Sequence, residues 1–420
     1  MITESLWGVD DQNCRCAEFK SKEPRVIATE FDAISVDQLR TAVGKKWSTF
    51  PDCTGAFVAE MDFGTAPTIQ DALRRVVDDG FFGYMPDFSL GEMQAACAHW
   101  YATRYGWDVP KERVRPLPDV IKAFELAMSD FSEPGCKVIV PTPAYMPFVS
   151  IPTMMNREII EVPSLLVDGR WEMDYDGIDA AFANGGGLLI LCNPHNPLGR
   201  VYERDELLRL SGIVAKQGGR VFSDEIHAPI TYPGHKHVPY ASISDEAAGH
   251  TITATSASKA WNLAGLKCAQ LILSNDADAE KWKNDCSFAE HGTSTFGAIA
   301  NAAAYSSGGA WLDEVIDYLD GNRKQLAAML GDLLPEVNYV MPEGTYLAWL
   351  DFRGTNIGED VDVYFRENAA VAITNGGACG EIGKGHVRFN LAMSRPLLIK
   401  SVEQMAAAVR SKSGASIAAR

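Results

Sequence analysis

Short apolar runs alternate with amphipathic helices through the middle of the chain, and this alternation constrains the fold more than any other feature. The strand-like runs are expected at 137–140, 158–162, 188–192, 220–223, 251–254 and 268–273. The helices around them are expected at 71–79, 92–105, 119–131, 145–155, 174–182 and 205–216. Continuous apolar runs are typical of strands buried on both faces. The pattern therefore predicts an α/β protein with a mostly parallel sheet flanked by helices.

The pattern changes after Gly308-Gly309. A helix of unusual length is expected at 310–334, and shorter elements follow it. These are strand-like runs at 338–341, 345–350, 370–374 and 387–390, with helices at 361–368 and 395–410. We therefore expect a large domain over 51–309 and a smaller α+β domain formed by 310–420 with the polar segment 1–50. That segment is expected to be irregular apart from a helix at 35–43, and the residues after 410 are expected to fray.

Charge and composition exclude several classes of protein. The chain has 55 acidic and 38 basic residues, a net charge of −17, which argues against nucleic acid as a partner. No apolar window is long enough to span a membrane, and we expect no secretory signal. Nine scattered cysteines favour a reducing, cytoplasmic location. Cys14 and Cys16 are the one tight pair, and their spacing does not suit a metal site, so no metal is expected.

Polar motifs follow several of the predicted strands, at the sheet edge where open α/β proteins bind their ligands. The first is NPHNPLG at 193–199, in which two Asn-Pro steps end the run 188–192 abruptly. They direct amide side chains such as that of Asn196 off the end of the sheet. Either a rigid turn or a binding loop would explain the motif.

The second motif places Asp224 and Glu225 at the end of an apolar strand. A carboxylate there is costly unless it is exposed or paired, so Asp224 is expected to cap a helix or to contact a ligand.

Basic residues carry the other two motifs. Lys259 follows two hydroxyl residues after the run 251–254, with Lys267 nearby. Serines and a second lysine could hold a phosphate, and a lysine beside them could form a Schiff base with an aldehyde. Arg388 interrupts the apolar run 387–390, and its planar fork suits a carboxylate. The alternative is a structural ion pair.

The order and spacing of Asn196, Asp224, Lys259 and Arg388 resemble those of the fold-type I pyridoxal-phosphate enzymes of the aspartate aminotransferase superfamily. The resemblance covers roughly residues 26–410. Five segments are similar to bacterial cystathionine β-lyases of the MalY/PatB type. They are AEMDF at 59–63, FGY at 82–84, TPAY at 142–145, SDEIH at 223–227 and TYLAWLD at 345–351. Glu60, where this branch usually has Asp, and Lys267, where many superfamily members have a phosphate-binding Arg, depart from the pattern.

The resemblance implies a large domain with a mostly parallel seven-stranded sheet, a smaller α+β domain and a bound pyridoxal 5′-phosphate. Lys259 would hold the cofactor as a Schiff base, and Asp224 would face its ring nitrogen. Tyr145 would stack on the ring, although core packing is the alternative for this side chain. These three are the implied catalytic residues. Asn196 would donate to the phenolic oxygen, and with Arg388 it would fix the substrate carboxylate.

The resemblance also implies a phosphate site and a homodimer. The phosphate would lie on the backbone N–H groups of Val120 and Ile121, at the start of the helix 119–131. The side-chain ligands expected there are Ser256, Ser258 and Lys267. Tyr84 would reach the cofactor and substrate from a neighbouring subunit. His227 occupies the place of a tyrosine partner of the phenolic oxygen, or is a surface histidine.

The expected activity is β-elimination from L-cystathionine or a related S-substituted cysteine, which yields a thiol, pyruvate and ammonia. An aminotransferase shares every cofactor contact and is the alternative. A regulatory protein that keeps the fold without chemistry is disfavoured, because Lys259 and Asp224 are both present. A nucleotide-binding protein is disfavoured because no GxxxxGK[ST] motif occurs and no GxGxxG follows a strand.

Overall fold

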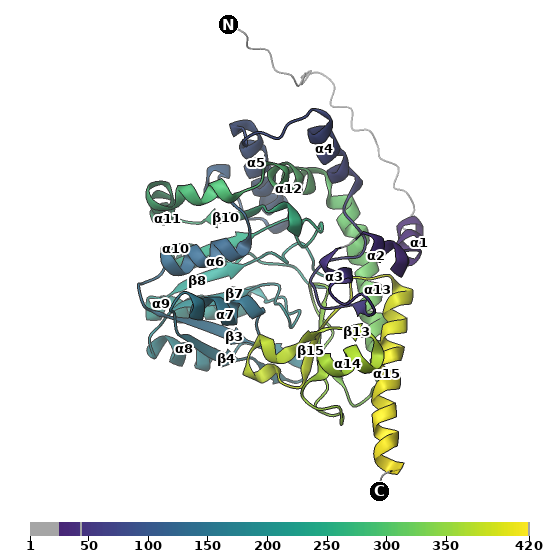
Figure 1. Ribbon diagram of the computed structural model, residues 1–420. Helices are drawn as coiled ribbons and strands as arrows, with labels where there is room; N and C mark the ends of the chain where they lie inside the picture. Colours follow the sequence, from purple (N-terminus) through teal and green to yellow (C-terminus); the bar gives the residue numbers. More distant parts are fainter. Residues whose placement is uncertain (1–24, 43, 419–420) are drawn as a thin grey trace.

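A seven-stranded sheet forms the centre of the computed structural model, which describes residues 25–42 and 44–418 (Figure 1). The strand order is β2-β10-β9-β8-β7-β3-β4. Neighbours from β9 to β4 run parallel, and β10 is antiparallel to both β9 and β2. The predicted mostly parallel sheet is therefore confirmed. Its strands are β2 Val114–Leu117, β3 Lys137–Thr142, β4 Ile159–Pro163, β7 Gly186–Cys192, β8 Arg220–Asp224, β9 Thr251–Thr255 and β10 Ala269–Leu273.

Strand β7 explains why the apolar runs are continuous. Leu188 and Ile190 pack with helices α6 and α7 on one face of the sheet. Leu189 and Leu191 pack with α8, α9 and α10 on the other face. Because successive side chains alternate between two covered faces, every position of the strand must be apolar. The helices are α6 Val120–Ser129, α7 Met146–Met154, α8 Tyr175–Ala183, α9 Arg204–Gln217 and α10 Asp245–His250.

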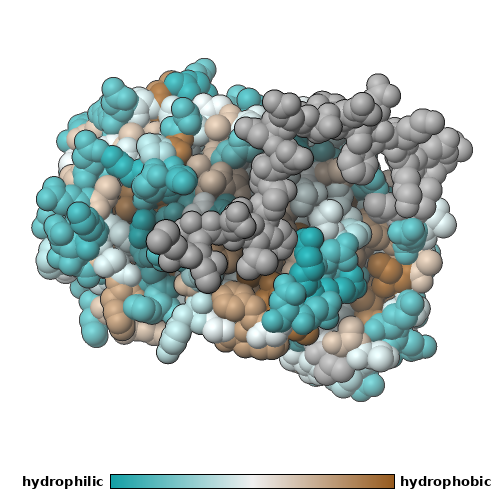
Figure 2. Space-filling model, turned by 90° about the horizontal axis from the view of Figure 1, so that it is seen from above, coloured by the Kyte–Doolittle hydropathy of each residue, from teal (hydrophilic) through white to brown (hydrophobic). Residues whose placement is uncertain are grey.

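Three further helices gather beyond the β2 edge of the sheet, at the top of Figure 1. They are α4 Pro67–Asp78, α5 Asp87–Tyr105 and α12 Thr295–Ser307. Large apolar side chains are exposed here, among them Phe82 and Phe88. Figure 2 looks down on this side and shows brown apolar surface between hydrophilic side chains. The large domain also contains helix α11, Asp276–Lys281, and a hairpin of β5 Leu165–Val167 with β6 Arg170–Glu172.

The C-terminal part is the α+β unit that the sequence indicates. A long helix, α13, packs against α15, and both lie on the right of Figure 1. A four-stranded sheet has the order β11-β12-β15-β14. The elements are α13 Gly309–Leu333, β11 Asn338–Tyr339, β12 Leu347–Asp351, α14 Val361–Ala369, β13 Val371–Ala372, β14 Thr374–Asn375, β15 His386–Asn390 and α15 Arg395–Ala418.

The described part of the N-terminal segment is more regular than expected. It forms α1 Arg25–Asp32, α2 Val36–Thr41 and α3 Lys45–Ser48, where we expected one helix at 35–43. Strand β1, Thr54–Gly55, then pairs in parallel with β13. The domain boundary expected at residue 51 assigns β1 to the large domain, although this pairing joins β1 to the C-terminal unit.

The C-terminal helix continues to Ala418, so the expectation that it ends at Arg410 is wrong. One anchor is Lys412, whose Nζ donates to the carbonyl oxygen of Ile357 at 3.0 Å and lies 4.7 Å from the ring centre of Tyr364. Within residues 25–42 and 44–418, no helix is long and apolar enough to cross a membrane. The same residues include no group of three or more His, Cys, Asp or Glu side chains arranged to hold a metal. Cys14 and Cys16 lie outside the described residues.

Candidate active site

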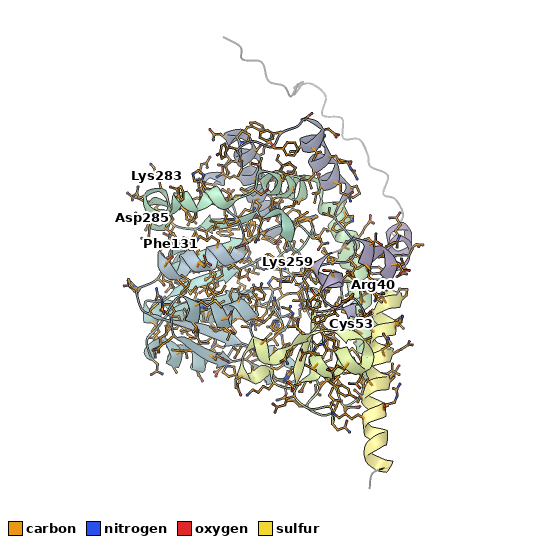
Figure 3. All side chains as sticks on the ribbon, in the orientation of Figure 1. Arg40, Cys53, Phe131, Lys259, Lys283 and Asp285 are labelled. Carbon is orange, nitrogen blue, oxygen red and sulfur yellow. The ribbon has the colours of Figure 1, made fainter. Side chains whose placement is uncertain are left out.

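A cavity of about 440 Å³ opens where β7, β8 and β9 end and the C-terminal unit meets the sheet. Its size suits one small-molecule ligand. Lys259 marks its position near the centre of Figure 3, far from Lys283 and Asp285 at the edge of the large domain. Of the predicted site residues, the cavity is lined by Val120, Ile121, Tyr145, Asn196, Asp224, His227, Ser258, Lys259, Lys267 and Arg388.

Lys259 follows β9 on a short turn, and its Nζ donates to the carbonyl oxygen of Ala59 at 3.0 Å. Burial lowers the pKa of Lys259 to about 8, and the positive charge of Arg388 acts in the same direction. The carboxylates of Glu60 and Asp224 oppose this shift. A lysine with a pKa near 8 is a free amine for part of the time at neutral pH, which is the form that attacks an aldehyde or accepts a proton.

Asp224 ends β8 with its side chain buried. Its Oδ1 accepts the N–H of Ile226 at 3.1 Å, and its Oδ2 lies 3.8 Å from the Sγ of Cys192. Burial raises the pKa of Asp224 to about 7, although the Ile226 N–H and Lys259 favour the ionised form. No helix begins at Asp224, so the helix-cap alternative is wrong. The carboxylate is suited to a cationic partner inside the cavity, because such a partner would offset its desolvation.

His227 is buried, so the surface alternative for this residue is wrong. Its Nδ1 has no hydrogen-bond partner within the part of the chain that the structure describes. Burial, with Lys259 and Arg388 nearby, holds the pKa of His227 well below its usual range. The neutral ring therefore offers the cavity a polar group for a ligand atom.

Asn196 and Arg388 meet across the cavity wall. The Nη1 of Arg388 donates to the Oδ1 of Asn196 at 3.1 Å, and its Nη2 donates to the carbonyl oxygen of Phe57 at 2.9 Å. The buried Nε has no hydrogen-bond partner among residues 25–42 and 44–418. Among the described side chains no carboxylate forms an ion pair with Arg388, which removes the structural ion-pair alternative. Asn193, by contrast, stabilises the turn, because its Oδ1 accepts the N–H of Tyr202.

The end of the cavity where the phosphate is expected, called the phosphate end below, is the N-terminus of α6. Val120 and Ile121 begin this helix, and the Asp119 side chain caps it by accepting the N–H of Lys122. Lys267 reaches the same place and forms an ion pair with the Oδ2 of Asp119 at 2.9 Å. A helix N-terminus with a lysine beside it favours a bound phosphate.

Ser256 and Tyr84 are not brought to the cavity wall. The buried hydroxyl of Ser256 donates to the carbonyl oxygen of Cys268 at 2.7 Å and accepts the N–H of Ser258. Its hydrogen bonds therefore shape the turn before Lys259. Tyr84 is 99% exposed and lies in a separate hollow with Phe82 and His291. It could join a site only in another copy of the chain.

Tyr145 precedes α7 and lines the cavity, with its ring against the edge of Phe148. Burial raises the pKa of its phenol. The ring lines the cavity and also packs on the core, as the packing alternative expects, and its stacking on the cofactor stays a prediction.

Sequence reasoning missed two features of the cavity wall and one buried contact. Lys45 lines the cavity. Residues 57–59 form one wall, in which the backbone carbonyl oxygens of Phe57 and Ala59 accept hydrogen bonds from Arg388 and Lys259. Backbone acceptors leave no mark in the sequence. The third is Cys192, which contacts Asp224; the apolar run offered no hint of this contact.

These residues fit pyridoxal 5′-phosphate. The cavity offers a lysine that can be neutral, a buried carboxylate that forms no ion pair among the described residues, and a helix N-terminus with a cation. They match the aldehyde, the ring nitrogen and the phosphate of that cofactor. His227 and Asn196 supply polar atoms between these ends.

Comparison with known proteins gives concordant matches. The family model described as aminotransferase class I and II matches residues 56–404. Cystathionine β-lyase from Corynebacterium glutamicum is 40% identical and covers 88% of this chain and 98% of its own. Cystathionine β-lyase PatB from Bacillus subtilis is 35% identical over 85% of this chain and 93% of its own. The structure of cystalysin from Treponema denticola, which contains pyridoxal 5′-phosphate, aligns with a TM-score of 0.83 and 29% identity. This alignment covers 90% of this chain and 98% of that one.

Proposed function

The chain belongs to the class I and II aminotransferase family, and we propose that within it the protein is a pyridoxal 5′-phosphate-dependent carbon–sulfur lyase. Its substrate is L-cystathionine or a related S-substituted cysteine. With cystathionine and water, β-elimination yields homocysteine, pyruvate and ammonia. One observation carries this proposal: Lys259, Asp224 and Arg388 line a single cavity in a chain whose relatives at 35–40% identity are named cystathionine β-lyases.

The cofactor supplies an electron sink that stabilises negative charge on the α-carbon of a bound amino acid. Asp224 supports this role because its carboxylate, buried at the end of β8, favours a protonated ring nitrogen. The phosphate would be held by the backbone N–H groups of Val120 and Ile121 with Lys267.

Lys259 serves twice. Its amine would hold the aldehyde of the cofactor, and the same amine, when free, would take the α-proton of the substrate as a general base. Its pKa of about 8 suits that task at neutral pH. Arg388 and Asn196 fix the substrate carboxylate, so that the proton on the α-carbon is presented to Lys259.

The leaving group separates a lyase from an aminotransferase. A thiolate leaves the β-carbon readily because the pKa of its conjugate acid is about 8.5. Lys259, having accepted the α-proton, can return a proton to the departing sulfur. An aminotransferase instead retains the β-substituent and needs an oxo acid to accept the amino group.

The same proposal includes a homodimer in the cytoplasm, without nucleic acid or membrane as a partner. Two observations support the dimer. Tyr84 is almost fully exposed, and apolar side chains such as Phe82 and Phe88 are exposed close to it in the chain. In an isologous dimer, each Tyr84 would complete the site of the other subunit, where it would contact cofactor and substrate.

The test is the release of thiol from L-cystathionine by the purified holoenzyme without an oxo acid. Thiol and pyruvate in equal amounts would support the lyase. Turnover that strictly requires 2-oxoglutarate or pyruvate and releases no thiol would contradict it.

A further inference from the structure

Four basic side chains line the cavity, and the roles assigned above use three of them. Lys259 carries the chemistry, Lys267 pairs with Asp119 at the phosphate end, and Arg388 faces Asn196. The fourth is Lys45. Its ammonium forms no ion pair with a carboxylate in the part of the chain that the structure describes. The wall therefore offers one cation that the cofactor and the α-carboxylate do not require.

The position of Lys45 is set by its buried neighbour. The Nζ of Lys46 pairs with the Oδ2 of Asp62 at 2.9 Å and donates to the carbonyl oxygens of Glu60 and Ala392. Trp47 also donates to Asp62, at 2.8 Å. These contacts fix the short helix α3 against the segment that leads into the cavity, so Lys45 is anchored at its backbone while its side chain stays exposed.

The same packing connects the helix of Lys45 to the wall segment that holds Arg388. Helix α3 approaches β1 so closely that a Cβ on Gly55 would lie 2.1 Å from the carbonyl oxygen of Lys46. The chain then runs from β1 into the wall segment 57–59, where the carbonyl of Phe57 accepts from Arg388. The phosphate end is built by other elements, the start of α6 and Lys267.

We propose that Lys45 is a specificity-determining residue that binds the distal carboxylate of the substrate, the one on the half of the thioether that leaves. This inference rests on the proposed function. L-cystathionine carries an amino-acid group at each end, and Arg388 accounts for one carboxylate. An ammonium on a flexible stem at the cavity mouth can reach the other as a point charge. Because Lys45 is exposed, water and salt screen the attraction, so its effect is moderate.

The test compares two substrates that differ at the distal end. L-cystathionine has a distal carboxylate, and S-ethyl-L-cysteine has none. The quantity measured is the ratio of kcat/KM for cystathionine to kcat/KM for S-ethyl-L-cysteine, at low and high salt. The variants are Lys45→Ala and Lys45→Arg, with Lys283→Ala as a control that removes one exposed lysine far from the cavity (Figure 3).

We expect Lys45→Ala to lower this ratio about fivefold through KM for cystathionine, as the loss of about 1 kcal/mol of binding would. In Lys45→Arg and Lys283→Ala the ratio should stay within about twofold of that of the unmodified enzyme. Added salt should lower the ratio of the unmodified enzyme toward that of Lys45→Ala. A ratio unchanged in Lys45→Ala, or an equal loss with both substrates, would overturn the assignment. Failure of the proposed function would look different, because the unmodified enzyme would release no thiol. In that case, spectral titration of each holoenzyme variant with the two amino acids would give their dissociation constants, and these would still show whether Lys45 binds the distal carboxylate.

Discussion

The guanidinium of Arg388 donates to the side-chain oxygen of Asn196 at 3.1 Å, although 192 residues separate them in the chain. Arg388 lies on β15 of the C-terminal unit, and Asn196 follows β7 of the large sheet. The contact joins the group expected to hold the substrate carboxylate to the group expected to hold the cofactor. This hydrogen bond therefore joins the two units at the place where the substrate carboxylate is expected to bind.

Arg388 should not be replaceable by another cation. Its Nη1 and Nη2 point in directions fixed by Asn196 and by the carbonyl of Phe57, a geometry that a lysine cannot copy. We expect both Arg388→Ala and Arg388→Lys to lower kcat/KM for L-cystathionine by about 2–5 kcal/mol, or thirtyfold to several thousandfold. Steady-state thiol release measures the loss, with the exposed Arg353→Lys as control. A change smaller than threefold in Arg388→Ala would refute the assignment.

Lys259 should be the lysine that reacts with the cofactor aldehyde. Incubation of cofactor-free protein with pyridoxal 5′-phosphate, then borohydride and peptide mass spectrometry, should place the label on Lys259. Because burial lowers its pKa to about 8, labelling should rise between pH 7 and 9 as the amine loses its proton. Lys259→Ala should remove this label and abolish turnover. A main label on Lys45 or Lys267, which also line the cavity, would place the aldehyde elsewhere.

Asp224 should make the stability of the cofactor-free protein depend on pH. Burial raises its pKa to about 7, so the folded protein keeps this proton to a higher pH than the unfolded chain does. The contribution of Asp224 to the free energy of unfolding therefore falls as the pH rises from about 4 to 7, by about 1.4 kcal/mol per pH unit at most. Asp224→Asn should remove this pH-dependent fall in the free energy of unfolding.

Urea denaturation at pH 5 and pH 8 measures this effect. Relative to the unmodified protein, Asp224→Asn should be more stable at pH 8 than at pH 5, by up to a few kcal/mol. Added pyridoxal 5′-phosphate should stabilise the unmodified protein more than the variant, because the ring nitrogen gives the carboxylate its partner. An identical stability difference at both pH values would contradict the account of Asp224.

Tyr84 should act in trans. Lys259→Ala and Tyr84→Ala homodimers should each be impaired, whereas a hybrid of the two chains contains one site with neither substitution. Co-expression with two affinity tags, purification of the hybrid and assay of thiol release test this. Recovery of about half the unmodified activity per dimer is expected. A hybrid no more active than the parents, or a fully active monomer in sedimentation, would contradict the composite site.

The sequence could predict those parts of the site that depend on strand ends. Asp224 and Lys259 follow apolar strands, and parallel neighbours bring their carboxyl ends to one edge. The phosphate role expected of Ser256 stays a prediction, because a serine that donates to the backbone of Cys268 looks the same in sequence as one that faces a phosphate. The family pattern, more than periodicity, supplied the role of Arg388.

The same distinction applies to the fold, because some elements are evident from the local sequence and others depend on distant partners. The sequence predicts the buried strand β7, because both of its faces are covered and its residues are apolar. It does not predict β2, because Arg115 and Pro116 interrupt the apolar character of that strand. The short helix α3 depends on Lys46, whose ammonium is buried against Asp62 and distant backbone carbonyls. A lysine in a polar N-terminal segment gives no sign of such a partner, so helix α3 was not expected.

The central claim, β-elimination, is tested most directly by the stoichiometry of L-cystathionine consumption by the holoenzyme in the absence of any oxo acid. Thiol, pyruvate and ammonia should each appear at one equivalent per cystathionine consumed, over many turnovers, and 2-oxoglutarate should not raise the rate. Lys259→Ala should produce none of them. Conversion that stops after one equivalent per active site, resumes when 2-oxoglutarate is added and never releases thiol would contradict the account and identify the protein as an aminotransferase.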